Sequence, residues 1–261
     1  MKCLPKELIN EIRAKMNLVG EKENRERYSV LCYERKIKSI KKAAQINSYR
    51  IEHPEEVIPF NLPRKPREVR RGIKHITGAF KWGEENFNPA TLDEYFLKEL
   101  ACKITPDLYP GRSCAYYRNI GAKVTGSEFI SPSPEKVRIL EMPHFIQNII
   151  LHLENPDVIE VMKTAFYAHF NLTRIHPFED GNGRTARTFQ NVILNHYGFP
   201  VPVIESGERM TYYAFLRGAD EGYKERKALE RPGVSDGEKQ FYVYMAGKVN
   251  SSLNNIIDCL H

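Results

Sequence analysis

Apolar side chains recur every three or four residues along most of the chain, and this spacing predicts helices. Two N-terminal helices are expected over residues 5–17 and about 21–50, with Gly20 as the break between them. Further helices are expected over the stretches 67–80, 91–103, 135–153, 157–172, about 184–197, 208–220 and 237–258. The pattern therefore predicts an all-α fold.

Two stretches do not follow the helical pattern. Prolines recur in "HPEEVIPFNLPRKPREV", which predicts an extended connection between an N-terminal helical unit, residues 1–60, and a main body, residues 61–261. The second stretch, "TPDLYPGRSCAYYRNIGAKVTGSEFISPSP", combines prolines and glycines with alternating apolar positions. We expect it to form a loop and a short β-hairpin.

Composition narrows the class of protein. With 261 residues, 41% of them hydrophobic, the chain can bury a sizeable core. It has no apolar run of membrane-spanning length, and its start lacks the apolar centre of a signal peptide, so we expect a cytoplasmic protein without a membrane partner. Five scattered cysteines, none spaced as CxxC, predict reduced thiols rather than disulfides or a zinc site.

Positive charge is concentrated in the N-terminal part of the chain. The net charge is +6, and residues 1–75 carry 19 Lys or Arg against 10 Asp or Glu. Charges of both signs fall on an expected exposed helix face, and no aromatic side chains interleave the basic ones as a platform for bases. We therefore expect no nucleic-acid partner.

The stretch "HPFEDGNGRTAR" gathers several groups that can act on one substrate. Pro177 disfavours helix at the preceding position, so His176 is expected in a loop after a helix. Gly181 and Gly183, on either side of Asn182, allow backbone N–H groups to point inward just before the next helix. Such a nest at a helix N-terminus predicts an anion site.

Charged side chains extend this anion site. Arg184 and Arg187 share one face of the first helical turn and offer two forks suited to phosphate oxygens. Asp180 is suited to hold Mg²⁺, which prefers carboxylate and phosphate oxygens. His176 can act as general base toward a hydroxyl, because an imidazole titrates near neutral pH. Together these residues predict a polyphosphate substrate.

The segment from His176 to Arg187 resembles, without a gap, the signature HPFx(D/E)GNGRxxR of Fic domain proteins. The resemblance implies a helical Fic fold with a core at about residues 110–225. It also implies transfer of AMP from ATP to a protein hydroxyl with release of pyrophosphate. His176 would be the base, Asp180 the Mg²⁺ ligand, and residues 181–183 the anion hole. Both arginines would grip phosphates, while Phe178 is expected only to anchor the loop in the core.

Two further segments are similar to parts of the same family. "YYRNIGAKVTGSEFISPSPEKV" looks like its hairpin flap over the nucleotide, with the candidate contacts Gly126, Ser127, Glu128 and Phe129. "YYAFLRGADEGY" is similar to the helix that borders the adenine. This places Tyr212, Tyr213 and Asp220 near the base, although Asp220 stands where Asn is common.

A third resemblance concerns regulation. "NSYRIEHPEE" contains Ser48 and Glu52 in the spacing of the family's inhibitory motif, (S/T)xxxE(G/N), with His53 as a departure at the last position. The resemblance implies that Glu52 pairs with Arg187 in place of the γ-phosphate of ATP. In some relatives the same Glu supports removal of AMP from a modified protein, which implies a second activity here.

Two other functions stay open at this point. One is a catalytically silent nucleotide-sensing module that Glu52 keeps shut. The other is a metal-dependent phosphohydrolase built on His169, His176 and Asp180. The favoured function is AMP transfer from Mg-ATP to Ser, Thr or Tyr of a target protein or of the chain itself, and the sequence leaves a homo-oligomer open.

Overall fold

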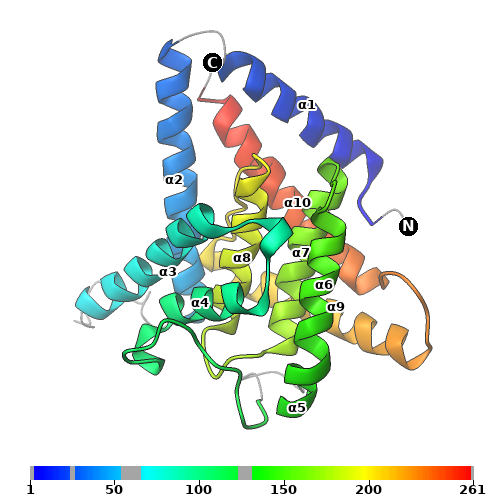
Figure 1. Cartoon of the computed structure of the whole chain (residues 1–261). Helices are drawn as coiled ribbons and strands as arrows, with labels where there is room; N and C mark the ends of the chain where they lie inside the picture. The colour runs from blue at the N-terminus through cyan, green and yellow to red at the C-terminus, as the bar shows by residue number, and fades with distance from the viewer. Residues whose placement is uncertain (1–2, 24–26, 54–65, 123–130, 260–261) are drawn as a thin grey trace. The chain divides into compact units, whose positions relative to one another are not determined.

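The computed structural model describes residues 3–23, 27–53, 66–122 and 131–259 (Figure 1). Two compact units make up the chain: residues 1–47 together with 197–261, and residues 48–196. Each helix expected from the apolar spacing has a counterpart in these ranges. Across the described ranges, no helix is both long enough and apolar enough to cross a membrane.

The unit of residues 1–47 and 197–261 is built from long helices. It contains α1 (Lys6–Glu23), most of α2 (Arg27–Glu52), the short η5 (Ser206–Glu208), α9 (Arg209–Ala228) and α10 (Asp236–Ile257), and α10 packs against α1 and α9. Ser235 begins α10 through a capping box with Glu238. The break predicted at Gly20 is wrong, because α1 continues through this glycine to Glu23.

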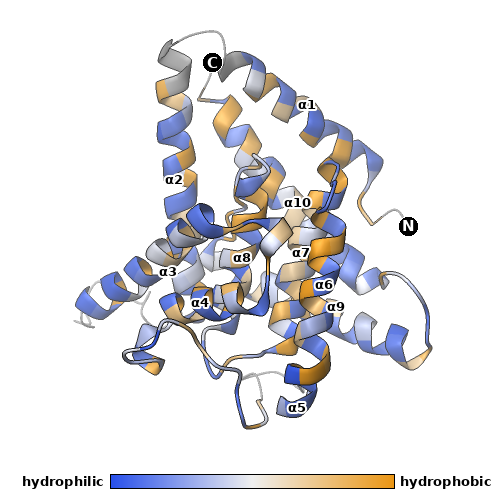
Figure 2. Ribbon diagram, viewed as in Figure 1, coloured by the Kyte–Doolittle hydropathy of each residue, from blue (hydrophilic) through white to orange (hydrophobic). Residues whose placement is uncertain are grey.

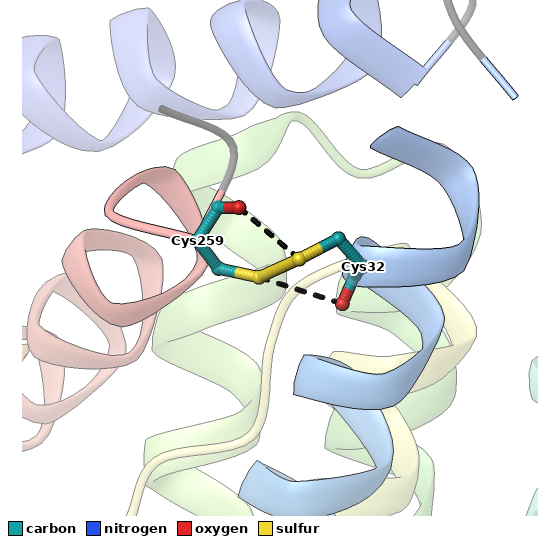
Figure 3. Close-up of a disulfide and its surroundings, with 2 residues drawn as sticks. All are labelled: Cys32 and Cys259. Carbon is teal, nitrogen blue, oxygen red and sulfur yellow. Dashed lines mark hydrogen bonds between the residues drawn. A yellow bond between two sulfur atoms is a disulfide. The ribbon is translucent and has the colours of Figure 1, made fainter. Parts of the chain in front are cut away.

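A disulfide lies within the same unit. Cys32 on α2 is bonded to Cys259, which follows the end of α10, and their Cα atoms are 6.5 Å apart (Figure 3). The expectation of reduced thiols is therefore wrong for this pair, whereas Cys102 and Cys114 are thiols. The two bonded residues are 227 positions apart, so their proximity depends on tertiary packing that sequence spacing does not reveal.

The unit of residues 48–196 begins with the last turn of α2 and contains the remaining helices. Its longer helices are α3 (Pro66–Asn86), α4 (Glu94–Ile104), α6 (Met142–Leu153), α7 (Val158–Ile175) and α8 (Asn182–His196). The short turns are η2 (Pro89–Thr91), η3 (Pro106–Leu108), α5 (Pro134–Lys136) and the π-helical turn η4 (Val137–Glu141). Figure 2 shows hydrophobic residues concentrated along α6 and mixed with hydrophilic ones along α3.

Helices α7 and α8 form the centre of this unit. They pack against each other, while α6 packs on α7 and both α3 and α4 pack on α8. Asp157 starts α7 by accepting hydrogen bonds from two backbone N–H groups of its first turn. Phe189 of α8 is fully buried, with ring contacts to Phe87, Phe96 and Phe145 at 5.9–6.4 Å between centroids. This packing holds the loop between α7 and α8 on a rigid base.

The predicted β-hairpin is not seen. No β-strand occurs in residues 117–122 or from residue 131 onward, and the positions between them, 123–130, lie outside the described residues. Backbone carbonyl groups on both flanks accept hydrogen bonds from side chains and not from a neighbouring strand. Arg118 donates to the carbonyls of Ile120 and Pro132, and Ser131 donates to that of Ala122. Prolines 132 and 134 also lack the N–H that a ladder requires.

One histidine belongs to the core between α7 and α8. His169 is fully buried, and its Nδ1 lies 2.7 Å from Oε1 of Gln190 on α8. Burial lowers the pKa of His169 from 6.5 to about 3. The unfolded chain therefore binds a proton at this residue below about pH 6.5, whereas the folded chain resists it until about pH 3.

We predict that this difference makes the protein less stable as the pH falls. Between pH 7 and pH 5 the free energy of unfolding should fall by about 2 kcal/mol more in the wild type than in His169→Gln. The glutamine keeps a polar partner for Gln190 but does not titrate. Urea unfolding followed by the fluorescence of Trp82, the sole tryptophan, reports on this unit. An equal loss in both proteins would contradict the neutral buried His169.

Candidate active site

His176 stands at the point where α7 ends. Its backbone is left-handed, with φ 52° and ψ 58°, and its N–H donates to the Leu172 carbonyl at 3.0 Å. This conformation usually favours glycine at a helix end and costs a residue with a side chain roughly 1–2 kcal/mol. Its Nδ1 atom is buried and has no hydrogen-bond partner among the described residues. The imidazole is thus partly buried in a loop, as predicted.

The loop after His176 is closed by a pair of reciprocal hydrogen bonds. The Asn182 side chain donates to the Phe178 carbonyl at 2.8 Å and accepts from the Phe178 N–H at 2.9 Å. Phe178 is fully buried, which confirms the prediction that it anchors the loop in the core. The side chain of Asn182 thus closes the loop, while the anion hole expected from the backbone N–H groups of residues 181–183 stays a prediction.

The glycines on both sides of Asn182 lie against different neighbours. Gly181 has φ +77°, and a Cβ there would meet Thr105 Cγ2 at 2.8 Å. A Cβ on Gly183 would collide with Oε1 of Glu52. The Glu52 carboxylate therefore lies against the first turn of α8, where the helix dipole and free N–H groups favour an anion.

Arg187 binds the last turn of α2. It is 4% exposed, and its Nε donates to Ser48 Oγ at 2.9 Å. Its Nη2 donates to the Ser48 carbonyl at 3.0 Å and to Glu52 Oε1 at 2.6 Å. The predicted contact between Glu52 and Arg187 is therefore present as a charge-assisted hydrogen bond.

Arg184 and Asp180 form a second ion pair at the start of α8. Nη2 of Arg184 lies 2.7 Å from Oδ2 of Asp180, whose side chain is 63% exposed. Nε of Arg184 is buried and has no hydrogen-bond partner within the described ranges. Buried polar atoms without partners are rare in folded proteins and often mark a ligand position.

Burial favours the neutral form of His176. Burial, the largest cause, lowers the pKa of His176 below its ordinary value of 6.5, and the nearby charge of Arg118 acts in the same direction. The Thr173 backbone and the carboxylates of Glu52 and Asp180 act in the opposite direction. A neutral imidazole can accept a proton at pH 7.

Sequence reasoning missed Thr185. This residue follows Arg184 in the first turn of α8, is fully buried, and its Oγ1 atom has no partner in the described part of the chain. Its position in the signature is variable, so the motif gave no signal. A hydroxyl in the first turn of a helix that begins at an anion site would have been a reason to include it.

Other predicted contacts lie elsewhere in the chain. Residues 126–129 are outside the described ranges. Tyr212, Tyr213 and Asp220 lie on α9, in the unit of residues 1–47 and 197–261. There the two tyrosine rings are 5.3 Å apart, and Asp220 pairs with Lys224 at 2.6 Å. Their contact with adenine stays a prediction.

The hypothesis of a metal-dependent phosphohydrolase gains no support. Nδ1 of His169 already faces Gln190. Within residues 3–23, 27–53, 66–122 and 131–259, no group of three or more His, Cys, Asp or Glu side chains could hold a metal ion. Asp180 offers an exposed carboxylate next to the first turn of α8.

Known proteins share both the sequence and the fold of this region. Residues 91–194 match the sequence model of the Fic/DOC family. Protein adenylyltransferase Fic of Nematostella vectensis is 38% identical over 96 residues, which are 37% of this chain and 22% of that relative. The match thus spans about a fifth of the relative's length.

Solved structures extend the likeness in fold. A Fic domain containing signaling protein from Bacteroides thetaiotaomicron aligns with a TM-score of 0.76 at 20% identity, covering 96% of this chain and 97% of that one. IbpAFic2, crystallised in complex with adenylylated Cdc42, aligns with a TM-score of 0.52 at 17% identity, covering 92% and 70%. Residues 91–194 therefore carry a Fic domain, and the fold of the chain is similar to that of a solved Fic domain containing protein.

Proposed function

We propose that the chain is a protein adenylyltransferase, which transfers AMP from ATP to a side-chain hydroxyl of a target protein. The observation that carries the proposal is the first turn of α8, where the buried Arg187 donates to the Glu52 carboxylate and the Gly183 backbone lies against the same carboxylate. Phosphate oxygens suit the same donors. The name of the Nematostella relative and the adenylylated Cdc42 bound to IbpAFic2 support AMP as the transferred group and a protein as the acceptor.

In the proposed reaction His176 is the general base. The neutral imidazole takes the proton of the acceptor hydroxyl as the hydroxyl oxygen attacks the α-phosphorus of ATP. A bond forms between that oxygen and the α-phosphorus, the bond from the α-phosphorus to the bridging oxygen breaks, and pyrophosphate leaves. General base catalysis contributes about 10²–10⁴-fold to such a step.

The other residues of the signature would hold the triphosphate. The N–H groups at the start of α8 are suited to phosphate oxygens, and Arg184 and Arg187 add two fixed positive charges. Asp180 fits a Mg²⁺ ligand, because its carboxylate is exposed and beside the anion site. Bound Mg²⁺ would neutralise phosphate charge, and no further protein ligand is required because Mg²⁺ usually keeps several waters.

We further propose that Glu52 inhibits this activity. Its carboxylate bonds to Arg187 and lies against Gly183, so it uses the donors that the γ-phosphate requires. ATP would bind in an unproductive position until the last turn of α2 withdraws. Removal of AMP from a modified protein, with the same carboxylate activating water, is the proposed second activity.

The contact between Glu52 and Arg187 also favours a second candidate, a silent nucleotide-sensing module. In that case Glu52 would hold the site shut under all conditions, and nucleotide binding without turnover would be the function. The two candidates differ in whether any variant transfers AMP.

We predict that ATP labelled at the α-phosphate labels protein most strongly in Glu52→Gly. The gain over wild type should be about 10- to 100-fold, because a hydrogen bond to a charged group contributes about 1.5–3 kcal/mol. The double variant Glu52→Gly/His176→Ala should carry no label. Incubation with Mg-ATP followed by gel autoradiography measures both.

A control with ATP labelled at the γ-phosphate should leave the protein unlabelled. Label from the γ-phosphate, or equal labelling in the His176→Ala variant, would exclude the mechanism. Tight ATP binding without label in any variant would favour the nucleotide-sensing module.

We also predict the pH dependence of labelling by Glu52→Gly. Only neutral His176 accepts a proton, and burial holds its pKa below 6.5. The initial rate should therefore be constant from pH 7 to 8 and fall about tenfold per unit at pH values below the pKa of His176. Because the Glu52 carboxylate raises the pKa of His176, its removal should move this fall in rate to a lower pH than in the wild type. A midpoint above pH 7 would contradict the assignment of His176 as the base.

A further inference from the structure

Arg118 is a buried cation whose partners are neutral. It is 1% exposed, and no carboxylate forms an ion pair with it in the described part of the chain. Burial accordingly lowers the pKa of its guanidinium. Burying a charge without a counter-ion is costly unless its donors are satisfied, so such a residue calls for a specific reason.

The donors of Arg118 converge on the loop that carries His176. Its Nε donates to the His176 carbonyl at 2.7 Å, and its own backbone N–H donates to the Pro177 carbonyl at 2.9 Å. Nη2 lies 3.5 Å from the Ile175 carbonyl. Two successive carbonyls of the loop, those of His176 and Pro177, therefore bind to this one residue.

The rest of the guanidinium is bound on its other side. Nη1 donates to the Ile120 carbonyl at 2.8 Å, while Nη2 donates to the Pro132 carbonyl at 2.6 Å and to Ser131 Oγ at 3.0 Å. These acceptors come from segments on both sides of positions 123–130. The guanidinium is consequently fixed in orientation and cannot follow the His176 carbonyl if that carbonyl rotates.

This arrangement explains how His176 keeps a strained backbone. The last carbonyls of α7 lack partners within the helix and carry its negative dipole end, so a cation stabilises them. A fixed donor on the His176 carbonyl also stabilises the left-handed φ and ψ against rotation to a helical or extended conformation. Such a rotation would point the imidazole in a different direction, because Cβ moves with the backbone.

We propose that Arg118 is the positioning residue of the catalytic base: its guanidinium holds the His176 carbonyl and thereby aims the imidazole at the acceptor hydroxyl. That His176 is catalytic rests on the proposed function. That Arg118 positions it rests on the geometry alone. The positive charge near the imidazole also favours its neutral form, which serves the same role.

The test is Arg118→Lys in a Glu52→Gly background. Lysine keeps the charge but loses the planar fork, so it cannot hold the loop and both flanking segments together. We expect the AMP transfer rate at saturating Mg-ATP to fall at least tenfold, with the Kd for Mg-ATP changed less than twofold. Arg138→Lys is the matched control, since Arg138 is exposed and donates to Asn119 from the same region. It should transfer AMP at the parent rate.

A second readout does not depend on activity. The ¹³Cα and ¹³C′ chemical shifts of His176, measured by NMR, report its left-handed backbone. They should move toward helical or extended values in Arg118→Lys and stay unchanged in Arg138→Lys. Unchanged His176 shifts in Arg118→Lys would overturn the proposal even if no variant transfers AMP. If the His176 shifts change in Arg118→Lys but the Glu52→Gly parent transfers no AMP, the positioning of His176 by Arg118 stands and the proposed function is refuted.

Kinetics alone can also overturn the proposal. A transfer rate for Arg118→Lys equal to that of the parent would do so, and so would a loss that follows entirely from weaker Mg-ATP binding. Melting curves of both Lys variants determine the folded fraction by which each rate is corrected.

Discussion

The contact between Glu52 and Arg187 is the interaction on which the state of the site depends. Arg187 is almost fully buried, and a buried guanidinium without acceptors would cost several kcal/mol. The last turn of α2 supplies those acceptors through the Ser48 hydroxyl, the Ser48 carbonyl and the Glu52 carboxylate. Under the proposed function, a phosphate that binds Arg187 would have to replace this charged partner, and nucleotide binding would then be coupled to the position of this turn.

The helices and the loop that carry the candidate active site are tightly packed. Helices α7 and α8 pack through buried aromatic side chains, and the loop between them is closed by Asn182. His176 and Arg184 both present buried polar atoms without partners in the described residues. Groups held by packed helices and left unsatisfied are arranged before a ligand arrives, so little reorganisation is needed when it binds.

The sequence predicted those features that depend on nearby residues. Helices followed from apolar spacing, and the site followed from a contiguous signature between His176 and Arg187. The pairing of Glu52 with Arg187 spans 135 positions and was predicted only through resemblance to a family. The disulfide between Cys32 and Cys259 and the hydrogen bond from Arg118 to the His176 carbonyl were missed, because both depend on tertiary proximity without a local pattern.

The predicted β-hairpin is a case in which the apolar pattern along the chain led to a wrong prediction. Alternating apolar positions predicted strands, whereas the flanking carbonyls bind the side chains of Arg118 and Ser131. Competition from side-chain donors is invisible in the periodicity of a sequence. The loop-closing hydrogen bonds of the Asn182 side chain are a further feature that the motif did not predict.

If Glu52 inhibits the proposed reaction, Glu52 and the γ-phosphate compete for Arg187. Calorimetry of ATP and ADP binding, in the presence of Mg²⁺, tests it in the wild type and in Glu52→Gly. We expect similar affinities for the two nucleotides in the wild type and a preference for ATP of about tenfold in Glu52→Gly, equivalent to about 1.4 kcal/mol. The same ratio of affinities in both proteins would contradict it.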